Sequence, residues 1–252
     1  HTRSPLIHNY WIKKNKINAI YEKKLINENE IENIILKIKK EEIHGLNVTT
    51  PFKKSVIPFI EDLTFEANES QSVNTIYLEN KKIVGHNTDI AGFELGMRHF
   101  KYDIKDKKIF ILGAGGVVPS IIIALKKLEA SKIFLCNRTK QKALNLKKYF
   151  KKLEVVNWGD TPFESDVIIN ATSVGLNEND DLKLDYDKIG GNKFFYDVIY
   201  NPKETLFLKK AKENGNRIEN GKLMFVYQAN QSFSIWNNVI PKIDEEVLKI
   251  LE

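Results

Sequence analysis

The sequence predicts an α/β protein built as two lobes. Between residues 109 and 214, short apolar runs alternate with stretches of helical periodicity, an order typical of a parallel sheet with helices on both faces. Ahead of that region, a helical stretch, a β-branched strand and a hairpin predict a separate, smaller α/β lobe. The length of 252 residues is sufficient for two modest domains, each with its own core.

The larger lobe is predicted from apolar runs that suit buried strands, each followed by an amphipathic stretch. Strands are expected at residues 109–112, 133–136, 154–156, 167–170 and 194–198. Helices are expected at residues 117–128, 140–150, 206–214 and 221–236. In such a sheet the ligand crevice lies beyond the carboxyl ends of the strands, where Asn137, Asn170 and Tyr200 fall.

The smaller lobe is predicted from a one-sided surface helix, a short strand that begins at Gly45, and a hairpin. The hairpin arms are expected at residues 74–78 and 82–85, and the helices at 31–38 and 243–251. A further helix, expected at 90–100, leads out of this lobe and joins it to the second. We expect the last helix to return to this lobe. The first domain is therefore placed at residues 1–89 with 237–252, and the second at 90–236.

Composition and charge exclude several functional classes. The net charge of +6 favours anionic ligands, but the lysines lie among glutamates without a basic stripe, so no nucleic-acid partner is expected. Cys136 is the single cysteine, which excludes an intrachain disulfide and fits a reducing cytoplasm. The five histidines show no metal-binding spacing, so we expect no metal. No apolar run reaches the roughly 18 residues of a membrane span.

A glycine turn separates the first strand of the larger lobe from its helix. The turn reads Gly113-Ala114-Gly115-Gly116, and Val117 opens the helical stretch. Such a turn directs backbone N–H groups at a helix N-terminus outward, where the helix dipole favours an anion, so a dinucleotide pyrophosphate is the expected ligand. Val118 replaces the third glycine of the usual pattern, which requires looser packing of helix on strand. This lobe is therefore predicted to be Rossmann-like.

The next strand ends in Asn137-Arg138-Thr139, near the place where a dinucleotide fold reads the ribose. A site selective for NAD would usually place an acidic residue there, and this stretch has none. The planar guanidinium of Arg138 instead suits the 2′-phosphate of NADP. Alternatively, Arg138 is a solvated turn residue and Thr139 caps the following helix. With the glycine turn upstream, we predict NADP as the cofactor.

Lys53 and Asp89 are the candidates for proton transfer, because each lies in a strand-end loop outside the nucleotide-binding lobe. An alcohol loses a proton from its oxygen as its carbon loses a hydride, so such a group is needed. The lysine would protonate the developing alkoxide during ketone reduction, and the aspartate would orient the lysine. Lysine is normally charged at pH 7, so alcohol oxidation should speed up as pH rises. Taken singly, Lys53 also suits a solvated side chain, and Asp89 a helix N-cap.

Motifs spread over nearly the whole chain resemble, in the same order, those of the shikimate dehydrogenases. Each motif alone is weak, but so many in one order are specific. They are Ser4-Pro5 with His8-Asn9, Asn47-Val48-Thr49 with Pro51 and Lys53, Ser72-Val73-Asn74-Thr75, Gly85 with Asn87-Thr88-Asp89, the glycine turn, Asn137-Arg138-Thr139, Asn170-Ala171-Thr172 with Gly175, Asp197-Val198-Ile199-Tyr200 with Pro202 and Thr205, and Gly221 with residues 224–228.

The resemblance implies a reversible, NADP-dependent reduction of 3-dehydroshikimate to shikimate, in the pathway to aromatic amino acids. It implies that the first lobe binds substrate and that Lys53 and Asp89 are the catalytic pair. Implied substrate contacts are Thr2 (in place of a usual serine), Ser4, Thr49, Asn74, Tyr200 and Gln228. Implied cofactor contacts are Gly113, Ala114, Gly115, Gly116, Val117, Asn137, Arg138, Thr139, Thr172, Val198 and Gly221.

Two other functions stay open: a dehydrogenase of broader specificity that also accepts quinate, and a non-catalytic NADP-binding regulator on the same fold. The absence of an acid beside Arg138 favours the narrower activity, and the presence of both Lys53 and Asp89 argues against the regulator. We expect a monomer or homodimer in the cytoplasm. The family's first strand should precede His1, so we expect a sequence truncated at its start, and Phe65 stands where relatives usually have an acid.

Overall fold

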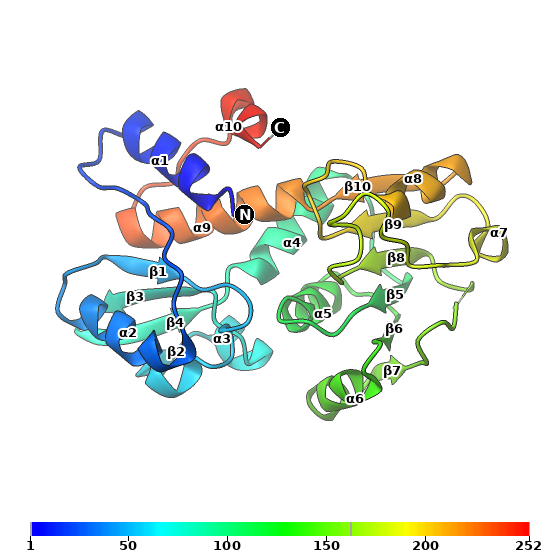
Figure 1. The fold of residues 1–252 in the computed structure, drawn as a ribbon, viewed down its shortest axis with the longest axis horizontal. Helices are drawn as coiled ribbons and strands as arrows, with labels where there is room; N and C mark the ends of the chain where they lie inside the picture. The colour runs from blue at the N-terminus through cyan, green and yellow to red at the C-terminus, as the bar shows by residue number, and fades with distance from the viewer. Residues whose placement is uncertain (1, 162, 252) are drawn as a thin grey trace. The chain divides into compact units, whose positions relative to one another are not determined.

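The computed structural model describes residues 2–161 and 163–251, which form two compact units (Figure 1). Unit 1 comprises His1–Gly96 and Met224–Glu252, and unit 2 comprises Met97–Leu223. Among the described residues, each unit combines helices with one sheet, in agreement with the predicted two-lobed α/β fold. The divisions between the units fall within helix α4 (Asp89–His99) and near the start of helix α9 (Lys222–Asn237).

Unit 2 is built on a 6-stranded sheet in the order β10-β9-β8-β5-β6-β7, and every neighbouring pair is parallel. Parallel order places the carboxyl ends of all these strands at one edge of the sheet. The strands are β5 (Lys108–Leu112), β6 (Lys132–Cys136), β7 (Leu153–Val155), β8 (Val167–Asn170), β9 (Phe194–Asp197) and β10 (Arg217–Asn220). The helices are α5 (Val118–Lys127), α6 (Lys140–Tyr149), α7 (Tyr186–Ile189) and α8 (Leu206–Glu213).

One face of this sheet is a row of large apolar side chains. The strand register places Phe134, Phe110, Ile168 and Phe195 side by side, one from each of four neighbouring strands. They are buried in one cluster with residues of α7 and α8, which cover this face. Buried on both faces, such strands are nearly continuous apolar runs, and this is why the sequence predicted them within one residue.

Strand β10 was not predicted. It reads Arg-Ile-Glu-Asn and lies at the edge of the sheet, with one side chain exposed and three half-buried. An edge strand of this kind lacks the apolar run that identifies a central one. Its pairing with β9 is visible only in the folded chain.

Unit 1 contains a 4-stranded sheet in the order β1-β3-β4-β2. Its strands are β1 (Gly45–Asn47), β2 (Asp62–Leu63), β3 (Thr75–Glu79) and β4 (Lys82–His86). The predicted hairpin is formed by β3 and β4, which are antiparallel. Its turn residues Asn80 and Lys81 both have positive φ, 49° and 63°, as a two-residue hairpin turn of the favoured hand requires.

Two groups of helices build the rest of unit 1, and their bounds are α1 (Ser4–Lys14), α2 (Ile31–Lys39), α3 (Phe65–Ser70), α9 and α10 (Glu245–Ile250). Helix α2 buries Ile31, Ile35 and Ile38 in a cluster that includes β3 and β4 residues. Helices α1, α9 and α10 share a second cluster that contains Trp11 and Val247. The predicted return of the last helix to the first lobe is therefore confirmed.

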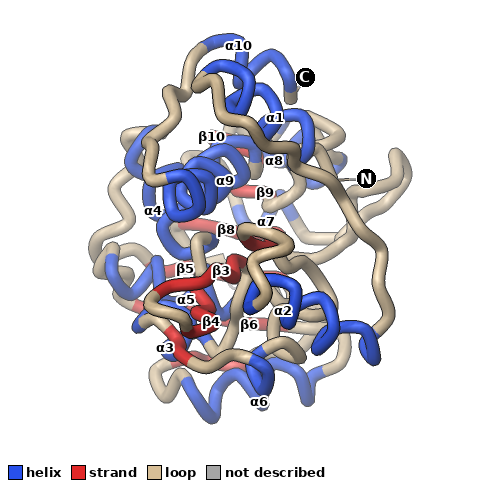
Figure 2. Tube along the Cα trace, turned by 90° about the vertical axis from the view of Figure 1, so that its left-hand side faces the viewer, coloured by secondary structure: helices blue, strands red, loops and turns tan. Residues whose placement is uncertain are grey.

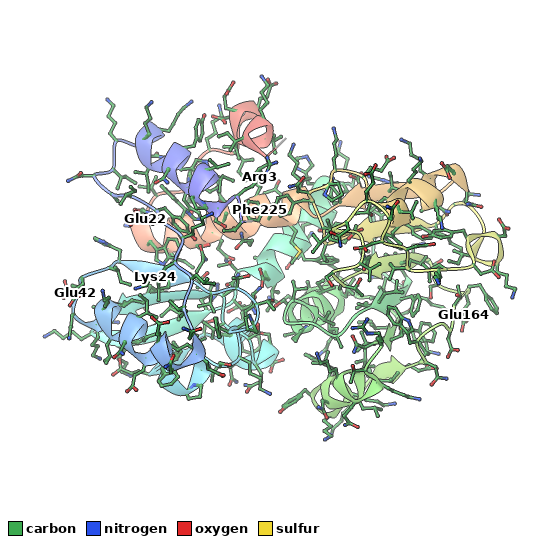
Figure 3. The ribbon with its side chains drawn as sticks, in the orientation of Figure 1. Arg3, Glu22, Lys24, Glu42, Glu164 and Phe225 are labelled. Atoms are coloured by element: carbon green, nitrogen blue, oxygen red, sulfur yellow. The ribbon has the colours of Figure 1, made fainter. Side chains whose placement is uncertain are left out.

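The chain between α1 and α2 is loop over residues 15–27, as Figure 2 shows, and a single 3-10 turn (Glu28–Glu30) leads into α2. A second such turn lies at Ile57–Phe59. Charged side chains of both signs are distributed over the surface, among them exposed Glu22 and Lys24 (Figure 3).

Candidate active site

Lys53 and Asp89 come from two loops at one end of the unit 1 sheet. Lys53 lies in the turns that follow β1, and Asp89 is the first residue of α4, shortly after β4 ends. Because β3 runs between β1 and β4 and is antiparallel to both, these two strands end on the same side. The Nζ of Lys53 consequently lies 2.5 Å from the Oδ2 of Asp89.

This ion pair is largely removed from water. The side chains of Lys53 and Asp89 are 13% and 8% exposed. Solvent screens such charges weakly, so each depends on its partner. Asp89 also lies in the first turn of α4, where the helix dipole favours negative charge, and its backbone N–H donates to Asn87 Oδ1 at 3.0 Å. The arrangement fixes the direction in which the lysine ammonium points.

Asn74, the residue immediately before β3, holds the Asp89 carboxylate of this ion pair through hydrogen bonds. Its Nδ2 donates to Asp89 Oδ1 at 3.0 Å and to the Thr88 hydroxyl at 2.9 Å. Its Oδ1 accepts from the Thr88 backbone N–H at 2.8 Å and from the Thr75 hydroxyl at 3.0 Å. Both ends of the amide are thus used within the protein. The structure shows Asn74 holding the carboxylate of Asp89, and its contact with a substrate stays a prediction.

Three further predicted substrate contacts lie in the N-terminal part of unit 1. The hydroxyls of Thr2 and Ser4 are 2.9 Å apart at the start of α1. Thr49 is exposed in the loop after β1, four residues before Lys53. All three offer hydroxyl groups that suit a polyhydroxylated ligand.

Gln228 lies on α9, which packs closely against α4 of the same unit. At Gly92 of α4, an added Cβ would lie 2.7 Å from the Met224 carbonyl oxygen and 2.9 Å from the Cβ of Gln228. Glycine is therefore required at this crossing. Sequence reasoning missed Gly92, because a glycine inside a helical stretch does not reveal what packs on it. The last predicted contact, Tyr200, belongs to unit 2 and is half-buried in the loop after β9.

The glycine turn of unit 2 follows β5, as predicted. Gly113 has φ +107°, and a Cβ there would lie 2.7 Å from the Ala171 carbonyl oxygen. Gly115 and Gly116 are exposed immediately ahead of α5. Val118, which replaces the usual third glycine, is the first residue of α5 and is fully buried. An exposed helix N-terminus with little side-chain bulk suits a pyrophosphate.

Asn137 ties this turn to the predicted 2′-phosphate site. Its Oδ1 accepts from the Ala114 backbone N–H at 3.0 Å, and its Nδ2 donates to the Thr139 carbonyl at 2.9 Å. Arg138 and Thr139 are exposed at the end of β6, and the Thr139 side chain makes no capping hydrogen bond to α6. A cation beside an exposed glycine turn has the chemistry that an extra phosphate needs. The residues present therefore fit NADP.

The remaining predicted cofactor contacts follow adjacent strands. Thr172 follows β8, Val198 follows β9 and Gly221 follows β10. The Thr172 hydroxyl donates to Asn170 Oδ1 at 2.7 Å, and the Val198 N–H donates to the Asn170 carbonyl at 3.0 Å. A Cβ on Gly221 would collide with the Val198 carbonyl, so only glycine allows this close approach.

Asp197 holds the loops after β8 and β9 in place through buried hydrogen bonds, a role that was not predicted from the sequence. It is fully buried at the end of β9. It accepts hydrogen bonds from Thr205 Oγ1 at 2.6 Å, from Asn170 Nδ2 at 3.1 Å and from the Ile199 N–H at 3.0 Å. Burial raises the pKa of Asp197 to about 6, although these bonds oppose the change. The feature of the sequence that could have indicated this role is an aspartate at the end of an otherwise aromatic strand.

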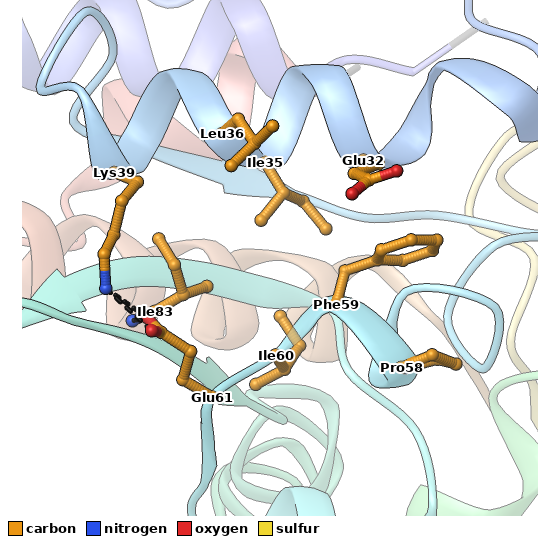
Figure 4. A pocket seen from close by; sticks show the side chains of 9 residues that line it. All are labelled: Glu32, Ile35, Leu36, Lys39, Pro58, Phe59, Ile60, Glu61 and Ile83. Carbon is orange, nitrogen blue, oxygen red and sulfur yellow. Dashed lines mark hydrogen bonds and ion pairs between the residues drawn. The ribbon is translucent and has the colours of Figure 1, made fainter.

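A groove in unit 1 does not coincide with any predicted site residue (Figure 4). It lies between α2 and the segment around the second 3-10 turn, and its lining residues are Glu32, Ile35, Leu36, Lys39, Pro58, Phe59, Ile60, Glu61 and Ile83.

Among the residues described, no helix is long and apolar enough to cross a membrane. Within the same part of the chain, no group of three or more His, Cys, Asp or Glu residues is placed to hold a metal ion.

Comparison with known proteins identifies the family. Residues 1–76 match the model of the shikimate dehydrogenase substrate binding domain, and residues 94–180 match the model of shikimate / quinate 5-dehydrogenase. A shikimate dehydrogenase (NADP(+)) of Pelagibacter ubique is 56% identical over 252 residues, which are 100% of this chain and 95% of that protein. The chain belongs to the shikimate dehydrogenase family.

Solved structures of this family share the fold. A shikimate dehydrogenase in complex with NADP+ superimposes with a TM-score of 0.91 at 32% identity, over 100% of this chain and 90% of that one. A shikimate 5-dehydrogenase of Thermus thermophilus in complex with NADP(H) and shikimate gives a TM-score of 0.90 at 25% identity, over 100% and 94%. The family inferred from the sequence motifs is confirmed.

Proposed function

We propose that this protein catalyses the reversible, NADPH-dependent reduction of 3-dehydroshikimate to shikimate, with Lys53 and Asp89 as the proton-transfer pair. The observation that carries the proposal is the buried ion pair of these two side chains at the end of the unit 1 sheet. Relatives that match 100% and 94% of the chain are named shikimate dehydrogenase (NADP(+)), which supports both the reaction and the cofactor.

The chemistry of the pair follows from its contacts. During reduction, the ketone oxygen of the substrate gains negative charge as its carbon accepts a hydride, and Lys53 Nζ donates a proton to that oxygen. During oxidation, a neutral lysine takes the hydroxyl proton back. Asp89 stabilises and orients the ammonium through its 2.5 Å contact, and Asn74 keeps the carboxylate from rotating away. Bound NADP supplies the nicotinamide carbon that gives or takes the hydride.

We divide the remaining predicted residues between those that bind the substrate and those that bind NADP. Hydroxyl and amide groups suit a small polyol acid, because an analogue that lacks a hydroxyl leaves a polar partner unpaired. We assign the substrate to Thr2, Ser4, Thr49, Asn74, Tyr200 and Gln228. We assign NADP to residues 113–117, Asn137, Arg138, Thr139, Thr172, Val198 and Gly221, with Arg138 on the 2′-phosphate.

The test is a matrix of kcat/KM values for shikimate and quinate, each with NADP and with NAD. We expect kcat/KM for shikimate to be at least about tenfold higher with NADP than with NAD, since the Arg138 contact with the 2′-phosphate is a charge-assisted hydrogen bond. With NADP, we expect kcat/KM to be higher for shikimate than for quinate. Comparable rates with quinate would favour the broader dehydrogenase. Binding of NADP without turnover of either acid would favour the non-catalytic regulator.

We also propose a cytoplasmic enzyme that is a monomer or a homodimer, acting on shikimate and 3-dehydroshikimate. A soluble biosynthetic enzyme that draws on NADPH suits that compartment. Its oligomeric state can be measured by analytical ultracentrifugation, and a larger assembly would contradict this part of the proposal.

A further inference from the structure

Asp197 receives hydrogen bonds from the ends of two neighbouring strands, β8 and β9. Its Oδ1 accepts from Asn170 Nδ2 at 3.1 Å, and the same oxygen accepts from the Ile199 backbone N–H at 3.0 Å. Its Oδ2 accepts at 2.6 Å from the hydroxyl of Thr205, the residue that caps α8. Because this carboxylate is fully buried, removing it would leave these donors without an acceptor.

Asn170 extends the restraint to Thr172, a proposed cofactor contact. The Asn170 Nδ2 that donates to Asp197 also donates to the Val174 carbonyl at 2.9 Å, so these two acceptors fix the orientation of the amide. Asn170 Oδ1 then accepts from the Thr172 backbone N–H at 3.0 Å and from the Thr172 hydroxyl at 2.7 Å. Asp197 thus orients Thr172 through one intervening side chain.

The backbone after β9 is connected to the same carboxylate. The Val198 N–H donates to the last carbonyl of β8 at 3.0 Å, and the next N–H along the chain, that of Ile199, donates to Asp197. The Ile199 carbonyl in turn accepts from the Gly221 N–H at 3.3 Å, immediately after β10. One buried carboxylate is therefore linked to three proposed cofactor contacts, namely Thr172, Val198 and Gly221.

The order of the strands indicates which part of the dinucleotide these loops would contact. The sheet order is β10-β9-β8-β5-β6-β7, and all these strands end at one edge. The 2′-phosphate of the adenosine half is assigned to Arg138 at the end of β6, and the pyrophosphate to the glycine turn at the end of β5. A dinucleotide has its pyrophosphate in the middle, so its nicotinamide half would continue over the ends of β8 and β9.

We propose that Asp197 is a positioning residue for the nicotinamide half of NADP, which holds the loops after β8, β9 and β10 in their binding arrangement before the cofactor binds. The inference rests on the proposed function, because it takes Thr172, Val198 and Gly221 as cofactor contacts. Loops that are ordered in advance lose less conformational freedom on binding, so Asp197 strengthens NADP binding although it is itself buried.

The direct test is Asp197→Ala, with dissociation constants measured by calorimetry for two probes. NADP contains both halves of the dinucleotide, whereas adenosine 2′,5′-bisphosphate contains the adenosine half with its 2′-phosphate and lacks the nicotinamide half. We expect the variant to bind NADP about tenfold more weakly, as for loops that hold the binding arrangement about a tenth of the time. The dissociation constant of the bisphosphate should stay within about twofold of the wild-type value.

The matched control is Asp166→Ala, at an aspartate immediately before β8 and so at the opposite edge of the same sheet. Its Oδ2 accepts from the Lys108 N–H at 2.9 Å, at the start of β5. The control also loses a carboxylate that accepts a backbone hydrogen bond, and it should bind both probes as the wild type does. Equal weakening of both probes in Asp197→Ala would indicate a general loss of structure and overturn the inference, as would an unchanged affinity for NADP.

Hydrogen exchange of the wild-type protein tests the same inference even if Asp197→Ala does not fold. The backbone N–H groups of Thr172, Val198 and Ile199 should be protected from exchange before NADP is added, since each already has an acceptor within unit 2. Exchange at the rate of an open loop, slowed only when NADP binds, would overturn the inference.

These readouts are binding and exchange, so a failure of the inference is distinguishable from a failure of the proposed reaction. A protein that shows the expected binding and exchange but does not turn over shikimate would support the role of Asp197 and overturn the proposed reaction. A wild-type protein that does not bind NADP would overturn both.

Discussion

Lys53 Nζ contacts one carboxylate oxygen of Asp89, and the other oxygen of that carboxylate accepts a hydrogen bond from Asn74. Asp89 is thus held on both sides, and the ammonium that it orients has a single direction. This relationship makes Lys53 the residue whose loss should harm catalysis most, because positioning and proton transfer would disappear together.

Lys53→Ala should lower kcat at least about 100-fold while shikimate binding stays measurable by calorimetry, since proton transfer typically contributes that much or more. The matched control is Lys54→Ala, at the neighbouring exposed lysine, which should retain turnover within twofold. Turnover that survives in Lys53→Ala would remove this residue from the mechanism.

Arg138→Ala should weaken NADP binding about ten- to a hundredfold and leave NAD binding nearly unchanged, because only NADP has the 2′-phosphate that the guanidinium would bind. Dissociation constants from fluorescence titration measure both effects. Lys147→Ala, at an exposed lysine in the last turn of α6, makes the same change of charge elsewhere on unit 2. An equal loss in both variants would indicate a general electrostatic effect and not a phosphate contact.

Gly92→Ala should destabilise unit 1, because the new methyl group would lie 2.7 Å from the Met224 carbonyl and 2.9 Å from Gln228 Cβ. A forced shift of α9 against α4 is expected to lower the free energy of unfolding by about 1 to 3 kcal/mol, measured by urea denaturation. The same shift moves Gln228, so the KM for shikimate should rise as well. A free energy of unfolding equal to that of the wild type would show that α4 and α9 can accommodate the added methyl group, and would contradict this prediction.

His8 should make the protein sensitive to acid. Burial lowers the pKa of His8 to about 3, and neither ring nitrogen has a hydrogen-bond partner within residues 2–161 and 163–251. The unfolded chain binds a proton at this histidine near pH 6.5 and the folded chain does not, so the free energy of unfolding falls as pH drops from about 6.5 toward 3. The contribution reaches about 1.4 kcal/mol per pH unit at most.

His8→Phe keeps an aromatic ring against Tyr21 and should flatten this dependence, which urea denaturation at several pH values measures. The control is His44→Phe, which makes the same substitution at an exposed histidine of the same unit. Identical slopes for His8→Phe and the wild-type protein would contradict the prediction.

Local patterns were sufficient for most of unit 2. Central strands such as β5 and β8 are buried on both faces, so their sequences are nearly continuous apolar runs. The glycine turn that follows β5 indicated where α5 begins. Strand β10 and helix α1 were not predicted, because neither has a clear local pattern of apolar residues. The first is a half-exposed edge, and the second begins with Ser4-Pro5 and mixes apolar with polar residues without a clear stripe.

The sequence by itself determined the family, the α/β class and the identity of the candidate residues, because motifs and apolar periodicity are local properties of a chain. Only the tertiary structure decided which of those residues meet. Lys53 reaches Asp89 through the antiparallel order of three strands, Gly92 is required by a helix far along the chain, and the hydroxyl of Tyr21 donates to Asn47, which lies 26 residues further along. Contacts of that kind depend on topology, and side-chain hydrogen bonds between distant segments leave no periodic trace in a sequence.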